Sequence, residues 1–129
     1  MHSIRTALIA LALLGACGRS TEPRSPQGTY TLATVNGAAL PALDANADTI
    51  RAGTAALNAD GTYHIDLQAR SGGASGAFGA FDILDDGTWS ATGSVVQLVQ
   101  AGTGALWANT YTGATLTIHM NGDVLGFSR

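Results

Sequence analysis

The sequence contains no lysine and only one cysteine, Cys17, among its 129 residues. One cysteine cannot form an intramolecular disulfide, so the fold must be held by packing and strand pairing alone. Charged residues make up only 12% of the chain and the net charge is −3, which leaves no basic patch for nucleic acid. We therefore expect neither a disulfide-stapled scaffold nor a nucleic-acid-binding protein.

Motifs that carry catalytic chemistry are missing as well. No serine occupies a Gly-x-Ser-x-Gly elbow, and the glycine-rich stretch 71–76 lacks the lysine of a phosphate-binding loop. The one glutamate, Glu22, precedes the first expected strand, so a paired-carboxylate hydrolase would need two of the aspartates. These absences predict that the protein is not an enzyme and has no cofactor.

The N-terminus has the arrangement of a secretory signal. Arg5 precedes an apolar run over residues 7–16, which ends in Leu-Gly-Ala directly before Cys17. This run is shorter than the roughly 20 apolar residues that a transmembrane helix needs. The segment 14–17 resembles the bacterial lipobox, which implies a signal peptide over residues 1–16 and a lipid on Cys17. The main alternative is a soluble secreted protein with a chance cysteine at the cut.

A lipid on Cys17 would attach the protein to a membrane, since each buried methylene contributes about 0.8 kcal/mol. In lipoproteins an aspartate after the cysteine often marks retention in the inner membrane, so Gly18 favours the outer membrane of a Gram-negative envelope, facing the periplasm or the surface. Residues 17–27 are polar and have no apolar periodicity, which predicts a flexible tether.

From Gly28 onward, short alternating segments are separated by turn residues. The expected strands are residues 30–35, 50–57, 62–68, 78–84, 88–91, 94–100, 106–111, 115–120 and 124–128. The turns between them include Asn36-Gly37, residues 58–61, Asp85-Asp86-Gly87 and Asn121-Gly122. Residues 38–47 have the composition for a short turn of helix.

Regular short strands predict an all-β domain over residues 28–129. An open antiparallel meander would expose two edges and an apolar face, whereas closure into a small, roughly eight-stranded barrel removes both. The last strand would then pair with the first, beside Tyr30. A two-sheet β-sandwich is the alternative fold.

Two features of this domain resemble small lipocalin-like bacterial lipoproteins. Gly28-x-Tyr30 is similar to the Gly-x-Trp start of a lipocalin, and it is followed by Val35-Asn36-Gly37 and Leu40-Pro41. The turns Asp60-Gly61-Thr62-Tyr63 and Asp86-Gly87-Thr88-Trp89 also recur in such proteins. In lipocalins an arginine near the last strand closes the barrel floor over the first-strand tryptophan. The resemblance implies that Arg129 stacks on Tyr30, a cation–π contact of about 0.5–2 kcal/mol. The alternative is that Arg129 is simply a frayed, charged terminus.

Aromatic residues are the best candidates for ligand contacts, although most must fill the core of a small barrel. The expected ligand-binding residues are Tyr30, Trp89, Trp107 and Tyr111. Trp107 stands out because its strand alternates Trp107, Asn109 and Tyr111, so that one face is half polar.

Metal chemistry has a weaker basis. His64 and Asp66 share one strand face, and with His119 they form a possible ligand set, but such residues on a wet strand face usually only solubilise. Asp85 and Asp86 are expected to stabilise their own turn by hydrogen-bonding the local backbone. We therefore predict no metal site.

The resulting functional prediction is a lipid-anchored binding module of the cell envelope, carrying a small apolar ligand in its barrel. Its partners would be the membrane and either that ligand or another envelope protein. The first alternative is a non-enzymatic interaction or inhibitor lipoprotein with a filled barrel. The second is a structural envelope protein without a ligand.

Overall fold

The computed structural model describes residues 25–71 and 79–129. The predicted signal peptide (1–16), Cys17 and most of the predicted tether (17–27) lie outside the described residues. So do Phe78 and most of the stretch 71–76.

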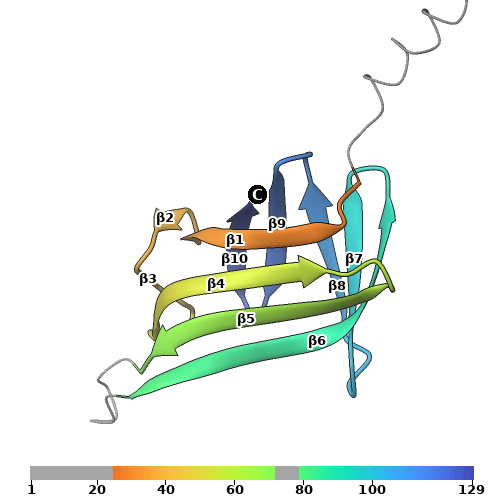
Figure 1. Ribbon diagram of the computed structural model, residues 1–129. Helices are drawn as coiled ribbons and strands as arrows, with labels where there is room; N and C mark the ends of the chain where they lie inside the picture. Colours follow the sequence, from red (N-terminus) through yellow and green to blue (C-terminus); the bar gives the residue numbers. More distant parts are fainter. Residues whose placement is uncertain (1–24, 72–78) are drawn as a thin grey trace, which may run out of the picture.

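In the described residues, ten antiparallel strands form one closed sheet (Figure 1). The barrel strands are β1 (Gly28–Val35), β4 (Thr49–Leu57), β5 (Thr62–Arg70), β6 (Ala80–Thr92), β7 (Val95–Gln100), β8 (Leu106–Tyr111), β9 (Thr115–Met120) and β10 (Asp123–Ser128). Strands β4 to β10 pair in sequence order, and β1 closes the barrel by pairing with both β10 and β4. The predicted eight-stranded barrel is confirmed, and the described residues do not form the alternative sandwich.

The last strand lies beside the first, as predicted. Thr31 pairs with Ser128 and Leu32 with Phe127, while Tyr30 pairs with Ala55 on the other edge of β1. Figure 1 shows β1, β4, β5 and β6 crossing in front of β7 to β10 at a steep angle. This small closed antiparallel barrel is compatible with a lipocalin-like architecture.

Strand alternation fills the barrel with apolar side chains. The predicted inward residues of β5 and β9 are all buried: Tyr63, Ile65, Leu67, Leu116, Ile118 and Met120. Tyr30, Leu57 and Phe127 are also fully buried and belong to the same core. Burial of each such side chain contributes about 1.5–3 kcal/mol to stability. Packing of these side chains therefore stabilises a domain that has no intramolecular disulfide.

The predicted turn at Asp85-Asp86-Gly87 is wrong, because these residues lie inside the continuous strand β6. The two strands expected at residues 78–84 and 88–91 are therefore one strand. Gly87 does not adopt the positive φ that a turn glycine uses, whereas Gly61 in the β4–β5 hairpin has φ +87°. Merging the two strands reduces the nine predicted segments to the eight that close the barrel.

Residues 38–47 form no helix. They hold two short strands, β2 (Ala38–Ala39) and β3 (Ala42–Leu43), which pair with β1 and β4. A turn follows in which the Asp44 carboxylate accepts the N–H groups of Asn46 and Asp48, both at 2.9 Å. Within residues 25–71 and 79–129, no helix is long and apolar enough to span a bilayer.

The barrel has two distinct ends. At the Arg129 end, β1 begins, β10 finishes, and the hairpins β4–β5, β6–β7 and β8–β9 turn. At the opposite Asp123 end lie the hairpins β7–β8 and β9–β10.

Candidate functional site

The Arg129 end is closed by a stacked cluster. The Arg129 guanidinium lies 4.9 Å from the centre of the Tyr30 ring, which confirms the predicted contact, and 5.5 Å from that of Tyr111. Its nitrogens also donate to the carbonyls of Ser25 and Gln27, both at 2.6 Å, and to the Tyr111 hydroxyl at 2.7 Å. Tyr30 and Tyr111 therefore both contact Arg129 in this cluster, which we name the Arg129 plug.

Trp89 secures the β4–β5 hairpin at the same end. Its indole Nε1 donates to the carbonyl of Asn58 at 2.8 Å, and its main-chain N–H donates to the carbonyl of Gly61 at 2.8 Å. Within that hairpin the Asp60 carboxylate accepts the side-chain hydroxyl of Thr62 at 2.6 Å and its N–H at 3.0 Å. These bonds lower the pKa of Asp60. The indole N–H of Trp89 is thus bonded to the main chain of the β4–β5 hairpin.

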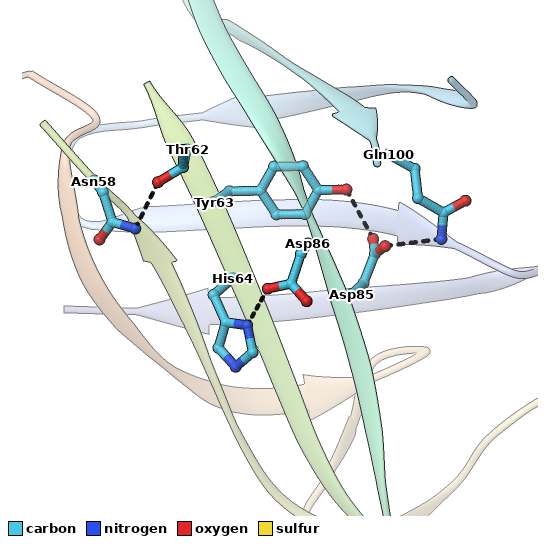
Figure 2. Close-up of polar contacts among 7 residues, drawn as sticks. All are labelled: Asn58, Thr62, Tyr63, His64, Asp85, Asp86 and Gln100. Atoms are coloured by element: carbon cyan, nitrogen blue, oxygen red, sulfur yellow. Dashed lines mark hydrogen bonds and ion pairs between the residues drawn. The ribbon is translucent and has the colours of Figure 1, made fainter. Parts of the chain in front are cut away.

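A buried polar network replaces the expected Asp85 turn (Figure 2). The carboxylate of Asp85, 5% exposed, points into the barrel. It accepts the Tyr63 hydroxyl at 2.9 Å and the side-chain N–H of Gln100 at 2.8 Å. Burial and the bond to Asp85 raise the pKa of the Tyr63 hydroxyl above its ordinary value of 10. Each buried polar group in this network therefore has a partner.

This raised pKa predicts a specific alkaline sensitivity. Since the folded pKa exceeds the unfolded one, the contribution of Tyr63 to stability is complete below pH 10 and declines as the pH rises above it. Above about pH 10, wild type should lose up to about 1.4 kcal/mol per pH unit more than Tyr63→Phe loses. At neutral pH the variant should be about 1–3 kcal/mol less stable, because it leaves Asp85 with one donor fewer. Urea unfolding at about pH 8 and pH 11 measures both effects, and equal alkaline losses would contradict the assignment.

The residues considered for a metal are not brought together. His64 and Asp66 lie on β5, in the front wall of the barrel, and His119 lies on β9, in the back wall (Figure 1). His64 instead pairs through Nδ1 with the carboxylate of Asp86, which raises the pKa of His64 (Figure 2). The described residues contain no group of three or more His, Cys, Asp or Glu side chains that could hold a metal ion.

The interior at the Asp123 end is also nearly full. Inward side chains such as Ile50, Leu67 and Leu125 leave a pocket of about 30 Å³ there, room for about two water molecules. The buried carboxylate of Asp123 accepts the side-chain N–H of Asn36 and the main-chain N–H of Ala45, both at 2.8 Å. These bonds fasten the chain after β3 across this end.

The pairing between strands β8 and β9 covers only part of their length. These strands pair only at Thr110–Thr117 and Tyr111–Leu116, whereas β7 and β8 pair all the way to Val99–Leu106. The buried side chain of Asn109 enters the gap, where its Oδ1 accepts the His119 N–H at 2.8 Å. The half-polar face of this strand is visible in the sequence, but the role of Asn109 as a spacer depends on its bond to His119 on another strand.

Beyond Asn109 the gap widens into an open pocket of about 330 Å³, which we name the β8–β9 slot. Its lining residues are Leu106, Trp107, Ala108, His119, Met120, Asn121, Gly122, Asp123 and Val124. Leu106 is 61% exposed and Val124 39% exposed, so apolar groups remain in contact with solvent on both sides. Trp107 is half-buried, and its buried Nε1 has no hydrogen-bond partner in the described part of the chain.

The structure therefore disperses the four predicted ligand-binding residues. Tyr30 and Tyr111 meet in the plug, Trp89 binds the β4–β5 hairpin, and Trp107 lies in the slot at the other end. Of the four, Trp107 alone combines an open pocket with an unsatisfied polar atom.

Comparisons with models of protein families, with curated proteins and with solved structures gave no match. A barrel fold hosts many functions, so the fold alone does not identify the function of this protein.

Proposed function

We propose that this protein is a lipid-anchored, non-enzymatic binding module of the cell envelope, which engages a partner protein through the outside of a filled barrel. The observation that carries the proposal is the packed interior. Tyr30, Tyr63 and Phe127 occupy it, and the pocket among the inward side chains of the Asp123 end holds about 30 Å³. Pockets for small ligands typically span roughly 300–1,000 Å³.

The anchor rests on the lipobox resemblance of residues 14–17, and the position of the first described residues determines which end of the barrel such an anchor would hold. Ser25 lies at the Arg129 end, where its carbonyl accepts hydrogen bonds from Arg129 and from Tyr111. A tether that starts from this end would turn the Arg129 end toward the membrane. The Asp123 end and the β8–β9 slot would then face a partner.

Native mass spectrometry and site-specific cross-linking test this proposal together. Protein purified gently from its host should carry no apolar cargo and should stay bare when oleic acid is added. A photo-cross-linking amino acid at exposed Leu106 or Leu84 should give a discrete protein adduct in intact cells, whereas the same group at buried Leu116 should give none. A co-purifying apolar molecule released on denaturation, without any adduct, would overturn the proposal in favour of a carrier.

A further inference from the structure

We propose that the β8–β9 slot binds a short extended peptide segment of the partner protein. The segment would pair its main chain with β8 and place one apolar side chain beside Leu106 and Val124. This inference rests on the proposed function and adds the site and the chemistry of the partner.

The first support is the direction of the main-chain groups of β8. The Tyr111 N–H donates to the carbonyl of Ser94, on the side of β7, at 2.8 Å. Main-chain groups of alternate residues in a strand point to the same edge, so those of Trp107 and Asn109 also face β7. The N–H and carbonyl groups of Leu106 and Ala108 therefore face the slot.

The second support is that β9 does not pair with the main-chain groups of Leu106 and Ala108. With Thr110 paired to Thr117, continuation of the ladder would bring Ala108 opposite His119. The His119 N–H instead goes to the side chain of Asn109, and no further β8–β9 pair forms. An unpaired strand edge is a template for another strand, and peptides commonly bind by adding to such an edge.

The third support is Trp107, which lines the slot and has a buried Nε1 without a partner. A buried donor without an acceptor is costly, so an acceptor from outside would be favoured. A peptide supplies such an acceptor in every main-chain carbonyl. The exposed Leu106 and Val124 offer apolar contact for one of its side chains.

Charge defines the segment further. Among the residues that line the slot, Asp123 is the single Asp, Glu, Lys or Arg; its carboxylate is buried and accepts the N–H groups of Asn36 and Ala45, so it acts on the slot through its negative potential and not as a direct partner. The described arginines lie elsewhere, with Arg51 on β4, Arg70 on β5 and Arg129 at the opposite end. A segment with an apolar centre and lysine at its ends therefore complements the slot better than an acidic one.

The test is an NMR titration of the ¹⁵N-labelled protein with the blocked pentapeptide Lys-Val-Thr-Val-Lys. We expect saturable shifts of the Leu106 and Ala108 amides and of the Trp107 indole N–H. Trp107→Phe, which keeps the ring and removes the donor, should weaken binding about two- to tenfold. Ala108→Pro, which removes one donor from the slot, should weaken it similarly, and Ala108→Val is its matched control.

Two further peptides sharpen the test. Lys-Val-Pro-Val-Lys lacks the central N–H, and Glu-Val-Thr-Val-Glu reverses the charge; both should bind more weakly. Absence of saturable shifts, shifts confined to other strands, or equal affinity for the proline peptide would overturn the slot assignment. A cross-linked partner at Leu84 but not at Leu106 would also overturn it while leaving the proposed function intact. A co-purifying apolar cargo without an adduct would instead defeat the proposed function itself.

Discussion

Gly87→Ala should destabilise the protein by about 3 kcal/mol, the upper end of the usual cost of overpacking and one of the two largest effects that we expect. A Cβ on residue 87 would lie 1.9 Å from the main-chain oxygen of Val99 and 2.8 Å from Cε1 of Tyr63. The first atom belongs to the neighbouring strand β7, so no side-chain rotation relieves the clash. The Tyr63 ring is buried and bonded to Asp85, so it cannot move without loss of that bond.

Urea unfolding measures the effect: Gly87→Ala should unfold at a lower urea concentration than wild type, with the same slope of unfolding free energy against urea concentration. Gly79→Ala is the matched control, because a Cβ there meets no atom within 4 Å and should change stability by less than about 0.5 kcal/mol. If the two variants unfolded at the same urea concentration, the close approach of β6 and β7 at Gly87 would be refuted.

Gly87 also shows that a local turn motif does not by itself predict a turn. Asp60-Gly61-Thr62 and Asp86-Gly87-Thr88 read alike, yet the first is a hairpin and the second lies within a strand. The difference comes from atoms remote in sequence. The Asp60 carboxylate accepts the hydroxyl of Thr62 within its hairpin, whereas a side chain at position 87 would collide with Val99 on the neighbouring strand. A local turn signal contains no information about such a neighbour.

The fold itself was predictable because it depends on alternation. The period of two in residues 62–68 and 115–120 identifies the inward faces, and closure follows from the need to cover the edges. The contact between Arg129 and Tyr30 was predictable through the family resemblance. Neither strand alternation nor the family resemblance predicts where the pairing between two strands stops.

The candidate site was only partly predictable for that reason. Trp107 was recognised from its half-polar strand, but the slot depends on the Asn109 side chain bonding to His119 on β9. An inward asparagine in an alternating strand is a visible signal. Its partner, however, is set by three-dimensional pairing, which the sequence pattern does not give.

Arg129→Ala should remove about 2–3 kcal/mol of stability, the other large effect. The side chain stacks on Tyr30 and Tyr111 and donates to the carbonyls of Ser25 and Gln27 at 2.6 Å. Hydrogen bonds from a charged donor are worth about 1.5–3 kcal/mol each, and the cation–π contacts add about 0.5–2 kcal/mol. Partial exposure of the group reduces the sum, since water replaces some of these bonds in the variant.

Arg129→Lys separates charge from shape. Lysine keeps the positive charge but lacks the planar fork, which reaches Ser25, Gln27 and the Tyr111 hydroxyl together. The stability of Arg129→Lys should therefore lie between those of wild type and Arg129→Ala, about 1–2 kcal/mol below wild type. Thermal unfolding reads both variants, because each 1 kcal/mol shifts the Tm of a domain of about 100 residues by roughly 4–8 °C.

Exposed Arg51→Ala is the matched control and should move the Tm by less than about 3 °C. A lysine variant as stable as wild type would mean that charge alone closes the Arg129 end. An alanine variant as stable as wild type would mean that the plug contributes nothing to folding. The expected order, wild type above Arg129→Lys above Arg129→Ala, follows because the fork ties the residues before β1 to the end of β10 and thereby completes the closure of the barrel.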